Sequence, residues 1–252
     1  MDFTDRVAVV TGAGSAHGIG RETVMELARR GASVIVADMN YVGAKAVATE
    51  ASEKYHVQSL AVEIDVTEES SVKAMYGIVE KTFHRLDILV NNAGITQPKT
   101  TEDMTVDDFM KIITVNMLGT FLCSKYAVFL MKKNNYGRIV SLSSVSGKRG
   151  GGVYGGSHYS AAKAGILGFS KALAREVVDY GITVNCVCPG AIATDIRRGI
   201  SDEKEASIAD GVPMHRVGTA KEVADTICFL ASDLASYITG EDIDVNGGSH
   251  MD

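Results

Sequence analysis

The chain has 252 residues, of which 46% are hydrophobic and 22% charged, and its formal net charge is −6. This length and apolar content suffice for one large core, and α/β chains of this size often form a single domain. The acidic balance provides no broad basic surface for nucleic acid, and the longest apolar runs look too short to cross a membrane. No signal peptide precedes the first predicted strand, so we expect a cytoplasmic protein whose partners are small molecules, not nucleic acids or membranes.

A glycine-rich segment follows the first predicted strand. Residues Arg6–Gly12 read as a buried strand that runs into the loop Gly12–Gly20 (GAGSAHGIG), and a helical pattern closed by Gly31 comes next. Strand, glycine loop and helix in this order are typical of a dinucleotide-binding turn, because glycines let the backbone approach a pyrophosphate. A plain βα turn is the alternative. The cofactor contacts predicted in this loop are Gly12, Gly14, Ser15, His17, Gly18 and Ile19.

An acidic residue ends the second predicted strand. Asp38 follows the apolar run Ser33–Ala37 and lies eighteen residues after Gly20. A carboxylate at this place can accept both adenosine ribose hydroxyls and repels a 2′-phosphate, which favours NAD over NADP. The next residue, Met39, is neutral, and His17 is the only basic group within the glycine loop. The alternative reading of Asp38 is a turn residue at the end of a strand.

Short apolar strands continue to alternate with helical patterns. Examples are Ile88–Val90, Arg138–Leu142 and Ile182–Val187. This alternation predicts an α/β fold in which helices cover both faces of a parallel sheet. From Ala191 to His215 the chain is polar, charged and helix-like, without strand periodicity.

The pair Tyr159 and Lys163 has the spacing of an acid/base couple. Positions i and i+4 lie on the same face of a helix. A free phenol has a pKa of about 10, and a positive charge nearby favours phenolate and lowers that pKa. We therefore expect Lys163 to lower the pKa of Tyr159 toward the range that a general acid/base needs. Ordinary helix surfaces also produce this spacing by chance.

The four cysteines, at positions 123, 186, 188 and 228, show neither a Cys-x-x-Cys motif nor a Cys/His metal spacing. We expect no bound metal and interpret these residues as core thiols, which agrees with a reducing cytoplasm.

Taken together, the motifs resemble the short-chain dehydrogenase/reductase family over nearly the whole chain. They are Thr11-Gly12 with Gly18-Ile19-Gly20, Asn91-Asn92-Ala93-Gly94, Asn116, Ser144, Tyr159 with Lys163, and Pro189-Gly190. The resemblance implies an NAD(P)-dependent oxidoreductase that acts on CH–OH groups. It also implies a single Rossmann-type domain over residues 1–252, with a doubly wound parallel sheet and a substrate lid at about 191–215.

The resemblance implies a role for each of four catalytic residues. Tyr159 is the acid/base, Lys163 holds the nicotinamide ribose and lowers the tyrosine pKa, Ser144 polarises the substrate oxygen, and Asn116 anchors a water that relays protons. Ser143 is the rival for the serine role, and the family pattern favours Ser144.

Further cofactor contacts follow from the same resemblance. Asp65 and Val66 match the pair that flanks the adenine, although Asp65 could equally cap the helix that begins near Glu68. Asn92 can brace the sheet as well as border the cofactor. Thr194 matches the hydroxyl that holds the nicotinamide carboxamide, and it can also cap a helix. The predicted contacts outside the glycine loop are Asp38, Asp65, Val66, Asn92, Ala93, Gly94, Tyr159, Lys163, Pro189, Gly190, Ile192 and Thr194.

Two segments are longer than in the family. Five residues, Ala13–His17, separate Thr-Gly from Gly-x-Gly where three are usual, and Ser144 and Tyr159 are 15 apart instead of 13. The second extension falls in Lys148–Gly156, which should arch over the substrate pocket, and whose glycines favour positive φ and close backbone approach. The predicted substrate contacts are Ser144, Arg149, Tyr154 and Tyr159, with Lys148, His158, Arg197 and Arg198 as further candidates.

Three functions remain open at this stage. The first is an NAD(H)-dependent dehydrogenase or reductase for a small secondary alcohol or ketone, such as a polyol, sugar or hydroxy acid. The second uses a 3-oxoacyl thioester or a hydroxysteroid with NAD(P)H, and the third is a non-catalytic nucleotide-sensing protein. By resemblance we expect a homotetramer, built through helices near Val106–Lys133 and Ser157–Tyr180 and through the last strand within Ile238–Gly248.

Overall fold

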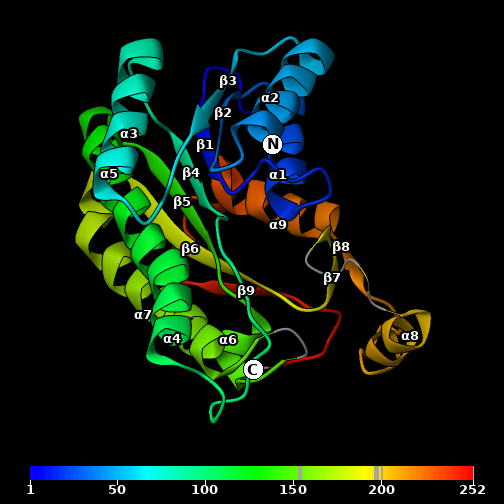
Figure 1. Cartoon of the computed structure of the whole chain (residues 1–252). Helices are drawn as coiled ribbons and strands as arrows, with labels where there is room; N and C mark the ends of the chain where they lie inside the picture. The colour runs from blue at the N-terminus through cyan, green and yellow to red at the C-terminus, as the bar shows by residue number, and fades with distance from the viewer. Residues whose placement is uncertain (153–154, 196–198, 200, 252) are drawn as a thin grey trace.

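The computed structural model describes residues 1–152, 155–195, 199 and 201–251, and a parallel sheet runs through its centre (Figure 1). Within these residues the sheet has seven strands in the spatial order β3-β2-β1-β4-β5-β6-β9. The predicted α/β fold with a doubly wound parallel sheet is confirmed. The strands are β1 (Val7–Thr11), β2 (Ser33–Asp38), β3 (Ser59–Glu63), β4 (Ile88–Asn91), β5 (Gly137–Leu142), β6 (Ile182–Pro189) and β9 (Asp242–Val245).

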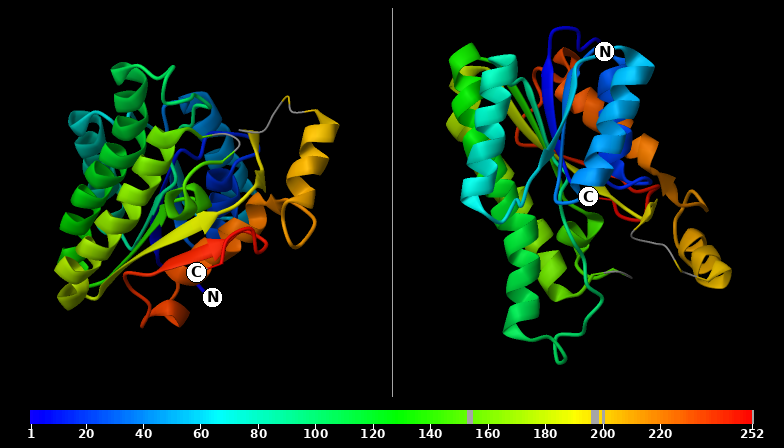
Figure 2. Two further views of the ribbon diagram at one scale, coloured as in Figure 1. Left: turned by 90° about the horizontal axis from the view of Figure 1, so that it is seen from below. Right: turned by 45° about the horizontal axis from the view of Figure 1, so that its top comes forward.

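Helices cover both faces of this sheet (Figure 2). Strand β1 is buried along its whole length, with Ala8 and Val10 in one hydrophobic core and Val7 and Val9 in the other. A strand buried on both faces reads as a continuous apolar run, as expected in a parallel sheet. The first core contains α1 (Ile19–Arg29), α2 (Tyr41–Tyr55) and α9 (Ala220–Ala231), and the second contains α3 (Glu69–Phe83), α5 (Gly119–Asn134) and α7 (Ser157–Val177).

One long helical segment corrects an expectation from the sequence. Helix α4 (Val106–Ile113) continues through a π-helical turn (Thr114–Leu118) into α5, so the segment Val106–Asn134 is long and apolar enough to cross a membrane by length and composition alone. The expectation that every apolar run is too short was therefore wrong. In this fold α5 contributes buried side chains to the core beside α3, Leu122 and Met131 among them.

The region after β6 contains a strand pair that the sequence did not predict. Strand β7 (Ile192–Ala193) pairs in parallel with β8 (Gly218–Thr219), and α8 (Asp202–Asp210) lies between them in the chain. Two-residue strands are too short to show an alternating pattern, which is why periodicity missed them. Arg197 and Arg198, both candidate substrate contacts, lie outside the described residues.

All four cysteines are buried and unpaired, which confirms the prediction of core thiols. Burial raises the pKa of the Cys123, Cys186 and Cys228 thiols to about 12 and that of Cys188 to about 11. Thiols with such high pKa values are protonated near neutral pH and are poor nucleophiles.

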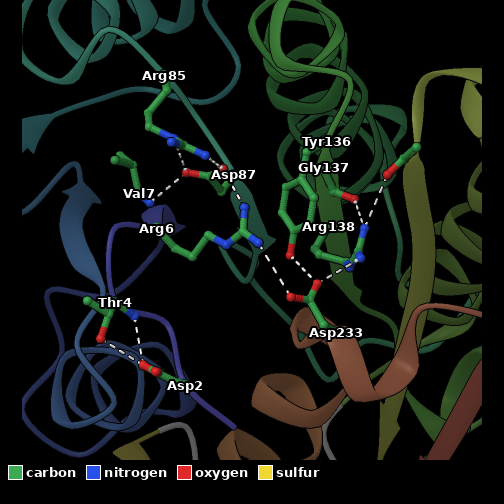
Figure 3. Close-up of polar contacts among 11 residues, drawn as sticks. Asp2, Thr4, Arg6, Val7, Arg85, Asp87, Tyr136, Gly137, Arg138 and Asp233 are labelled. Carbon is green, nitrogen blue, oxygen red and sulfur yellow. Dashed lines mark hydrogen bonds and ion pairs between the residues drawn. The ribbon is translucent and has the colours of Figure 1, made fainter.

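A polar network joins the amino ends of β1, β4 and β5 (Figure 3). Asp87 is fully buried and accepts hydrogen bonds from the Val7 amide (2.9 Å) and from the guanidinium groups of Arg85 (2.6 and 2.9 Å) and Arg6 (3.4 Å). A second carboxylate, Asp233, accepts hydrogen bonds from Arg6, Tyr136 and Arg138. The Tyr136 ring lies between two guanidinium groups, 3.8 Å from that of Arg6 and 4.3 Å from that of Arg138.

The opposite end of the sheet is where a ligand is expected. The strand order reverses between β1 and β4, and in open α/β sheets ligands bind at such a switch point, beyond the carboxyl ends of the strands.

Candidate active site

Tyr159 and Lys163 project from the first turns of α7. The Lys163 ammonium lies 5.7 Å from the centre of the Tyr159 ring and donates a 2.6 Å hydrogen bond to the Leu142 carbonyl at the end of β5. The side chain of Lys163 is buried. The i, i+4 spacing thus places the two groups on one side of the helix, as predicted.

The electrostatics of this pair differ from the expectation. Burial raises the pKa of Tyr159, and a hydrogen bond with Ser144 opposes that rise without reversing it. Burial also lowers the pKa of Lys163, to about 8. The prediction that Lys163 lowers the pKa of Tyr159 was therefore wrong: burial raises this pKa, and the group that opposes the rise is Ser144.

The two candidate serines have different surroundings. Ser143 is buried and its hydroxyl donates to the Lys163 carbonyl (2.8 Å), so that hydroxyl is engaged with the backbone of α7. Ser144 caps the short helix α6 (Val145–Arg149), accepts a hydrogen bond from the Ser146 amide (3.1 Å) and contacts Tyr159. Of the two serines, Ser144 is therefore the one beside the phenol.

Asn116 lies in the π-helical turn between α4 and α5 and is fully buried. Its amide nitrogen donates to the carbonyls of Ile95 and Ile112, both at 2.9 Å. Its Oδ1 is buried and has no hydrogen-bond donor among the described residues. A Cβ added to Gly94 would lie 2.5 Å from this oxygen and 3.6 Å from the Lys163 ammonium. Gly94 thus separates Asn116 from Lys163 with no side chain between them.

The glycine loop is held tightly against the end of β4. Gly12 adopts a φ of +65°, and a Cβ there would lie 2.6 Å from Ala93 Cα. The Asn92 amide donates to the carbonyls of Thr11 (2.9 Å) and Gly12 (2.8 Å). Asn92 therefore has the bracing role that the sequence left as an alternative.

Asp38 points from the end of β2 into this loop. Its two oxygens accept hydrogen bonds from the amides of Gly14 and Asn40, both at 2.8 Å. Asn40 caps α2 by accepting from the Gly43 amide, and a Cβ on Gly43 would lie 2.0 Å from the Gly14 carbonyl oxygen. The strand-end carboxylate, the glycine loop and the start of α2 form one close-packed corner.

The extension of the glycine loop reaches a residue that the sequence did not indicate. The Ser15 hydroxyl donates to Asp195 (2.5 Å), the His17 and Asp195 backbones are linked by a 3.0 Å hydrogen bond, and the His17 ring lies 3.4 Å from the Asp195 carboxylate. Ser15 and His17 were predicted to contact the cofactor. The sequence separation of 180 between Ser15 and Asp195 explains why no local pattern could reveal this contact.

The N-cap residue of α3 is Glu68, so a helix cap, the alternative left open by the sequence, is not the role of Asp65. Its carboxylate accepts from the amide (2.9 Å) and hydroxyl (2.7 Å) of Thr67, just before α3. Val66 is buried, and a Cβ on Gly119 would lie 2.8 Å from its side chain.

A cavity of about 460 Å³ brings many of the predicted residues together. All four predicted catalytic residues line it. Predicted cofactor contacts that also line it are Ile19, Asn92, Gly94, Pro189, Gly190, Ile192 and Thr194. The other predicted cofactor contacts do not line this cavity. They lie in the glycine loop, which ends in the N-cap residue of α1, and at or shortly after the ends of β2, β3 and β4. These residues are Gly12, Gly14, Ser15, His17, Gly18, Asp38, Asp65, Val66 and Ala93.

The lengthened segment after Ser144 forms one wall of this cavity. Gly150, Gly151 and Gly152 have positive φ, as predicted, and Gly155 approaches the Tyr159 ring so closely that a Cβ would lie 2.5 Å from it. Arg149 lines the cavity, whereas Tyr154 lies outside the described residues.

Two of the other candidate substrate contacts have different partners. Lys148 forms ion pairs with Asp242 (2.9 Å) and Asp244 (3.2 Å) on β9. His158 is fully buried, and its ring accepts a hydrogen bond from the Tyr159 amide (2.9 Å) and contacts Gln97 (3.5 Å). Neither residue lines the described part of the cavity, so the prediction that both are pocket residues was wrong.

These residues fit a nicotinamide dinucleotide. A loop with little side-chain volume opens α1, whose N-terminus offers amides to a pyrophosphate. The Asp38 carboxylate stands at the end of β2 beside this loop, and a phenol, a hydroxyl and an ammonium share the cavity.

Comparisons with known proteins agree with this geometry. Residues 12–250 match the family model described as enoyl-(acyl carrier protein) reductase. The chain is 46% identical over 249 residues to an uncharacterized short-chain type dehydrogenase/reductase, y4mP, of Sinorhizobium fredii, covering 98% of both chains. It is 43% identical over 251 residues to the 3-oxoacyl-[acyl-carrier-protein] reductase FabG of Escherichia coli, covering 100% of both. The crystal structure of levodione reductase superposes with a TM-score of 0.92 at 33% identity over 98% of each chain.

Proposed function

The chain belongs to the short-chain dehydrogenase/reductase family of NAD(P)-dependent oxidoreductases, which act on CH–OH groups, and from this premise we propose its reaction. We propose that it uses NAD(H) to interconvert a small secondary alcohol and its ketone, with a polyol, sugar or hydroxy acid as substrate. The observation that carries the proposal is the grouping of Ser144, Tyr159 and Lys163 in one cavity, with Asp38 bonded to the glycine loop.

We assign the acid/base step to Tyr159. The nicotinamide supplies hydride donation or acceptance, and the protein must exchange a proton with the substrate oxygen. The raised pKa of Tyr159 keeps the phenol protonated near neutral pH, which suits it to donate a proton to a ketone oxygen. Ser144, beside the phenol, provides a second hydrogen bond to the same oxygen and stabilises charge that develops there.

Lys163 and Asn116 support the movement of this proton. Near neutral pH most Lys163 side chains are ammonium groups, because their pKa is about 8. We also assign to the Lys163 ammonium a hydrogen bond that it donates to the nicotinamide ribose. The buried Asn116 Oδ1, which has no donor among the described residues, is an acceptor in position for a water that carries the proton onward.

We assign NAD selectivity to Asp38. A 2′-phosphate on the adenosine ribose would approach this carboxylate, and like charges about 4 Å apart repel by roughly 1–4 kcal/mol, depending on the effective dielectric. Met39 next to it is exposed and supplies no positive charge.

A second candidate function is supported by one comparison. FabG of Escherichia coli, 43% identical over 251 residues, is named a 3-oxoacyl-[acyl-carrier-protein] reductase. A 3-oxoacyl thioester or hydroxysteroid presents the same carbonyl chemistry to Ser144 and Tyr159, with NADPH as the alternative reductant.

The assembly that we propose is a homotetramer in the cytoplasm, each chain one domain with a lid at about 191–215. Exposed apolar side chains on α4 and α5, including Val106, Phe109, Phe121 and Phe129, would be covered at one two-fold interface. Tyr237, fully exposed just before β9 at the sheet edge, would be covered at another. Light scattering at micromolar concentration tests this assembly, and a monomer would contradict it.

A dehydrogenase screen tests the proposed reaction directly. Absorbance at 340 nm would be followed with NAD and with NADP against polyols, sugars, hydroxy acids and hydroxysteroids, and in reverse with the corresponding ketones and a 3-oxoacyl thioester. We expect turnover with NAD(H) on a small secondary alcohol or ketone. Turnover confined to the thioester or steroid would select the second candidate, and no turnover with any pair would contradict both.

A further inference from the structure

The charged side chains that line the catalytic cavity are positive, whereas the net charge of the whole chain is negative. The chain carries 31 acidic and 25 basic residues. Among the described residues that line the cavity, however, the charged side chains are Lys163 and Arg149, and no carboxylate is present. Lys163 belongs to the proposed proton and ribose site. Arg149 is left as a cation without an assigned role in the reaction.

Arg149 and its neighbour Lys148 are in contrasting environments. Lys148 is partly buried, with a side chain that is 8% exposed, and its charge is balanced by Asp242 and Asp244. The Arg149 guanidinium donates instead to a neutral group, the backbone carbonyl of Ser249 (2.9 Å), and forms no ion pair among the described residues. A guanidinium has five N–H donors, so this single bond leaves most of them available to an anion.

Helix α6 fixes the position of Arg149 relative to the reacting groups. Ser144 caps the helix at one end and Arg149 is its last residue. At 1.5 Å per residue, the two Cα atoms lie roughly 7–8 Å apart along the axis. Beyond Arg149, Gly150 and Gly151 put no side chains on this wall, and nothing lies within 4 Å of a Cβ built on either. Ser144 and Arg149 thus stand at the two ends of one short helix, and both line the cavity.

We propose that Arg149 binds an anionic group of the substrate, so that the alcohol or ketone carries a carboxylate or a phosphate. This inference rests on the proposed oxidoreductase function and narrows its substrate class. The anion pairs with the guanidinium in a bidentate manner, a geometry that arginine favours for both groups. Among polyols, sugars and hydroxy acids, the hydroxy acids and phosphorylated sugars fit this site.

Matched pairs of anionic and neutral substrates provide the test. The pairs are 3-hydroxybutyrate with its methyl ester, lactate with its methyl ester, and glycerol 3-phosphate with glycerol. The first two pairs report a carboxylate and the third a phosphate. Each would be assayed on the wild type, on Arg149→Met, which removes the charge, and on Arg149→Lys, which keeps it. Lys81→Met on α3, remote from the cavity lining, controls for the change in net charge.

We expect Arg149→Met to lower kcat/KM for the anionic member of a pair by about 10- to 100-fold and for the neutral member by less than about twofold. Arg149→Lys should recover part of the loss, and Lys81→Met should match the wild type. Equal losses on both members would overturn the proposal and make Arg149 an anchor for the Ser249 backbone. A wild type that prefers the neutral members would also overturn it while leaving the proposed reaction intact.

A binding measurement separates this proposal from the proposed function. Calorimetric titration of acetoacetate and of glycerol 3-phosphate into wild type and Arg149→Met, each with NAD present, requires no turnover. Weaker binding of either anion by Arg149→Met would support the anion site even if no alcohol were oxidised. Binding of neither anion, or equal binding by both proteins, would contradict the anion site whatever the outcome of the activity screen.

Discussion

The two ends of the central sheet treat their polar groups in opposite ways. At the amino ends, the buried Asp87 is bonded to Val7, Arg85 and Arg6, so its charge is compensated. At the carboxyl ends, the buried ammonium of Lys163 donates to a carbonyl, and no carboxylate in the described part of the chain balances it. Asn116 Oδ1, nearby, lacks a donor among the described residues.

From this difference we infer that the amino ends of these strands serve stability and the carboxyl ends serve the proposed chemistry. Compensated charges at the amino ends fix the strands relative to one another. The incompletely paired groups at the carboxyl ends cost free energy, and they are the groups that a cofactor and a substrate can satisfy. Substitutions at the amino ends should therefore change stability, and substitutions at the carboxyl ends should change turnover or ligand selectivity.

The largest expected effect is at the carboxyl end. Tyr159→Phe removes the proton donor and keeps the ring in place, so kcat should fall by about 10²–10⁴-fold while the melting temperature changes little. Steady-state kinetics on the substrate found in the screen, together with thermal denaturation, measure both quantities. Near-full activity of this variant would refute the role of Tyr159. A large loss of stability would contradict the separation between the two ends.

The matching change at the amino end is Asp87→Asn. It leaves Arg6 and Arg85 without their buried partner. Removing one partner of a buried pair can cost about 3–5 kcal/mol, and we expect about 2–4 kcal/mol here because both arginines are partly exposed and can be solvated. Urea denaturation measures the loss. At a temperature where the variant is folded, kcat should stay within about twofold of the wild type, and a larger fall would mean that the two ends are coupled.

Ligand selectivity at the carboxyl end should change at Asp38. Asp38→Asn removes the charge and keeps one acceptor for the glycine loop, so the preference for NAD over NADP should weaken by up to about 1–4 kcal/mol. Titration of both cofactors into wild type and variant measures the change. Glu176→Gln, an exposed position near the end of α7, removes a charge away from Asp38 and should leave the preference as it is. A wild type that binds NADP as tightly as NAD would refute the role of Asp38.

The smallest effect is expected at Asp233, the exposed member of the amino-end network. Burial acts to raise the pKa of this carboxyl, but the Tyr136 hydrogen bond and the charges of Arg6 and Arg138 outweigh it and hold the pKa below its ordinary value of 3.8. Its contribution to stability is therefore complete above that value and is lost as the pH falls through the lower native pKa.

Asp233→Asn should accordingly cost at most about 1 kcal/mol at pH 7, since the carboxylate is 65% exposed. The difference from the wild type should shrink below about pH 4, which urea denaturation at pH 7 and pH 3 would show. A difference that grew on acidification would contradict this reading.

Local patterns in the sequence predicted the fold and which residues share the cavity. They predicted less well the hydrogen bonds and ion pairs that the surrounding side chains form. Strand, glycine loop and helix in order located the crevice, and the Tyr159/Lys163 spacing placed both groups in one cavity. The pKa direction of Tyr159 was missed because burial is a property of the folded chain and not of a four-residue spacing. Asp195 was missed because its contact with Ser15 joins distant segments, and the pairing of Lys148 with β9 was missed for the same reason.

The close approach of Gly43 to Gly14 sets a limit on engineering the cofactor preference of this enzyme. A Cβ on Gly43 would lie 2.0 Å from the Gly14 carbonyl oxygen, so any side chain there would push α2 away from the glycine loop. Designs that insert an arginine for a 2′-phosphate must therefore leave Gly43 unchanged and work at exposed positions such as Met39, whose side chain is 67% accessible. A glycine outside the glycine loop thus limits which redesigns keep α2 packed against that loop.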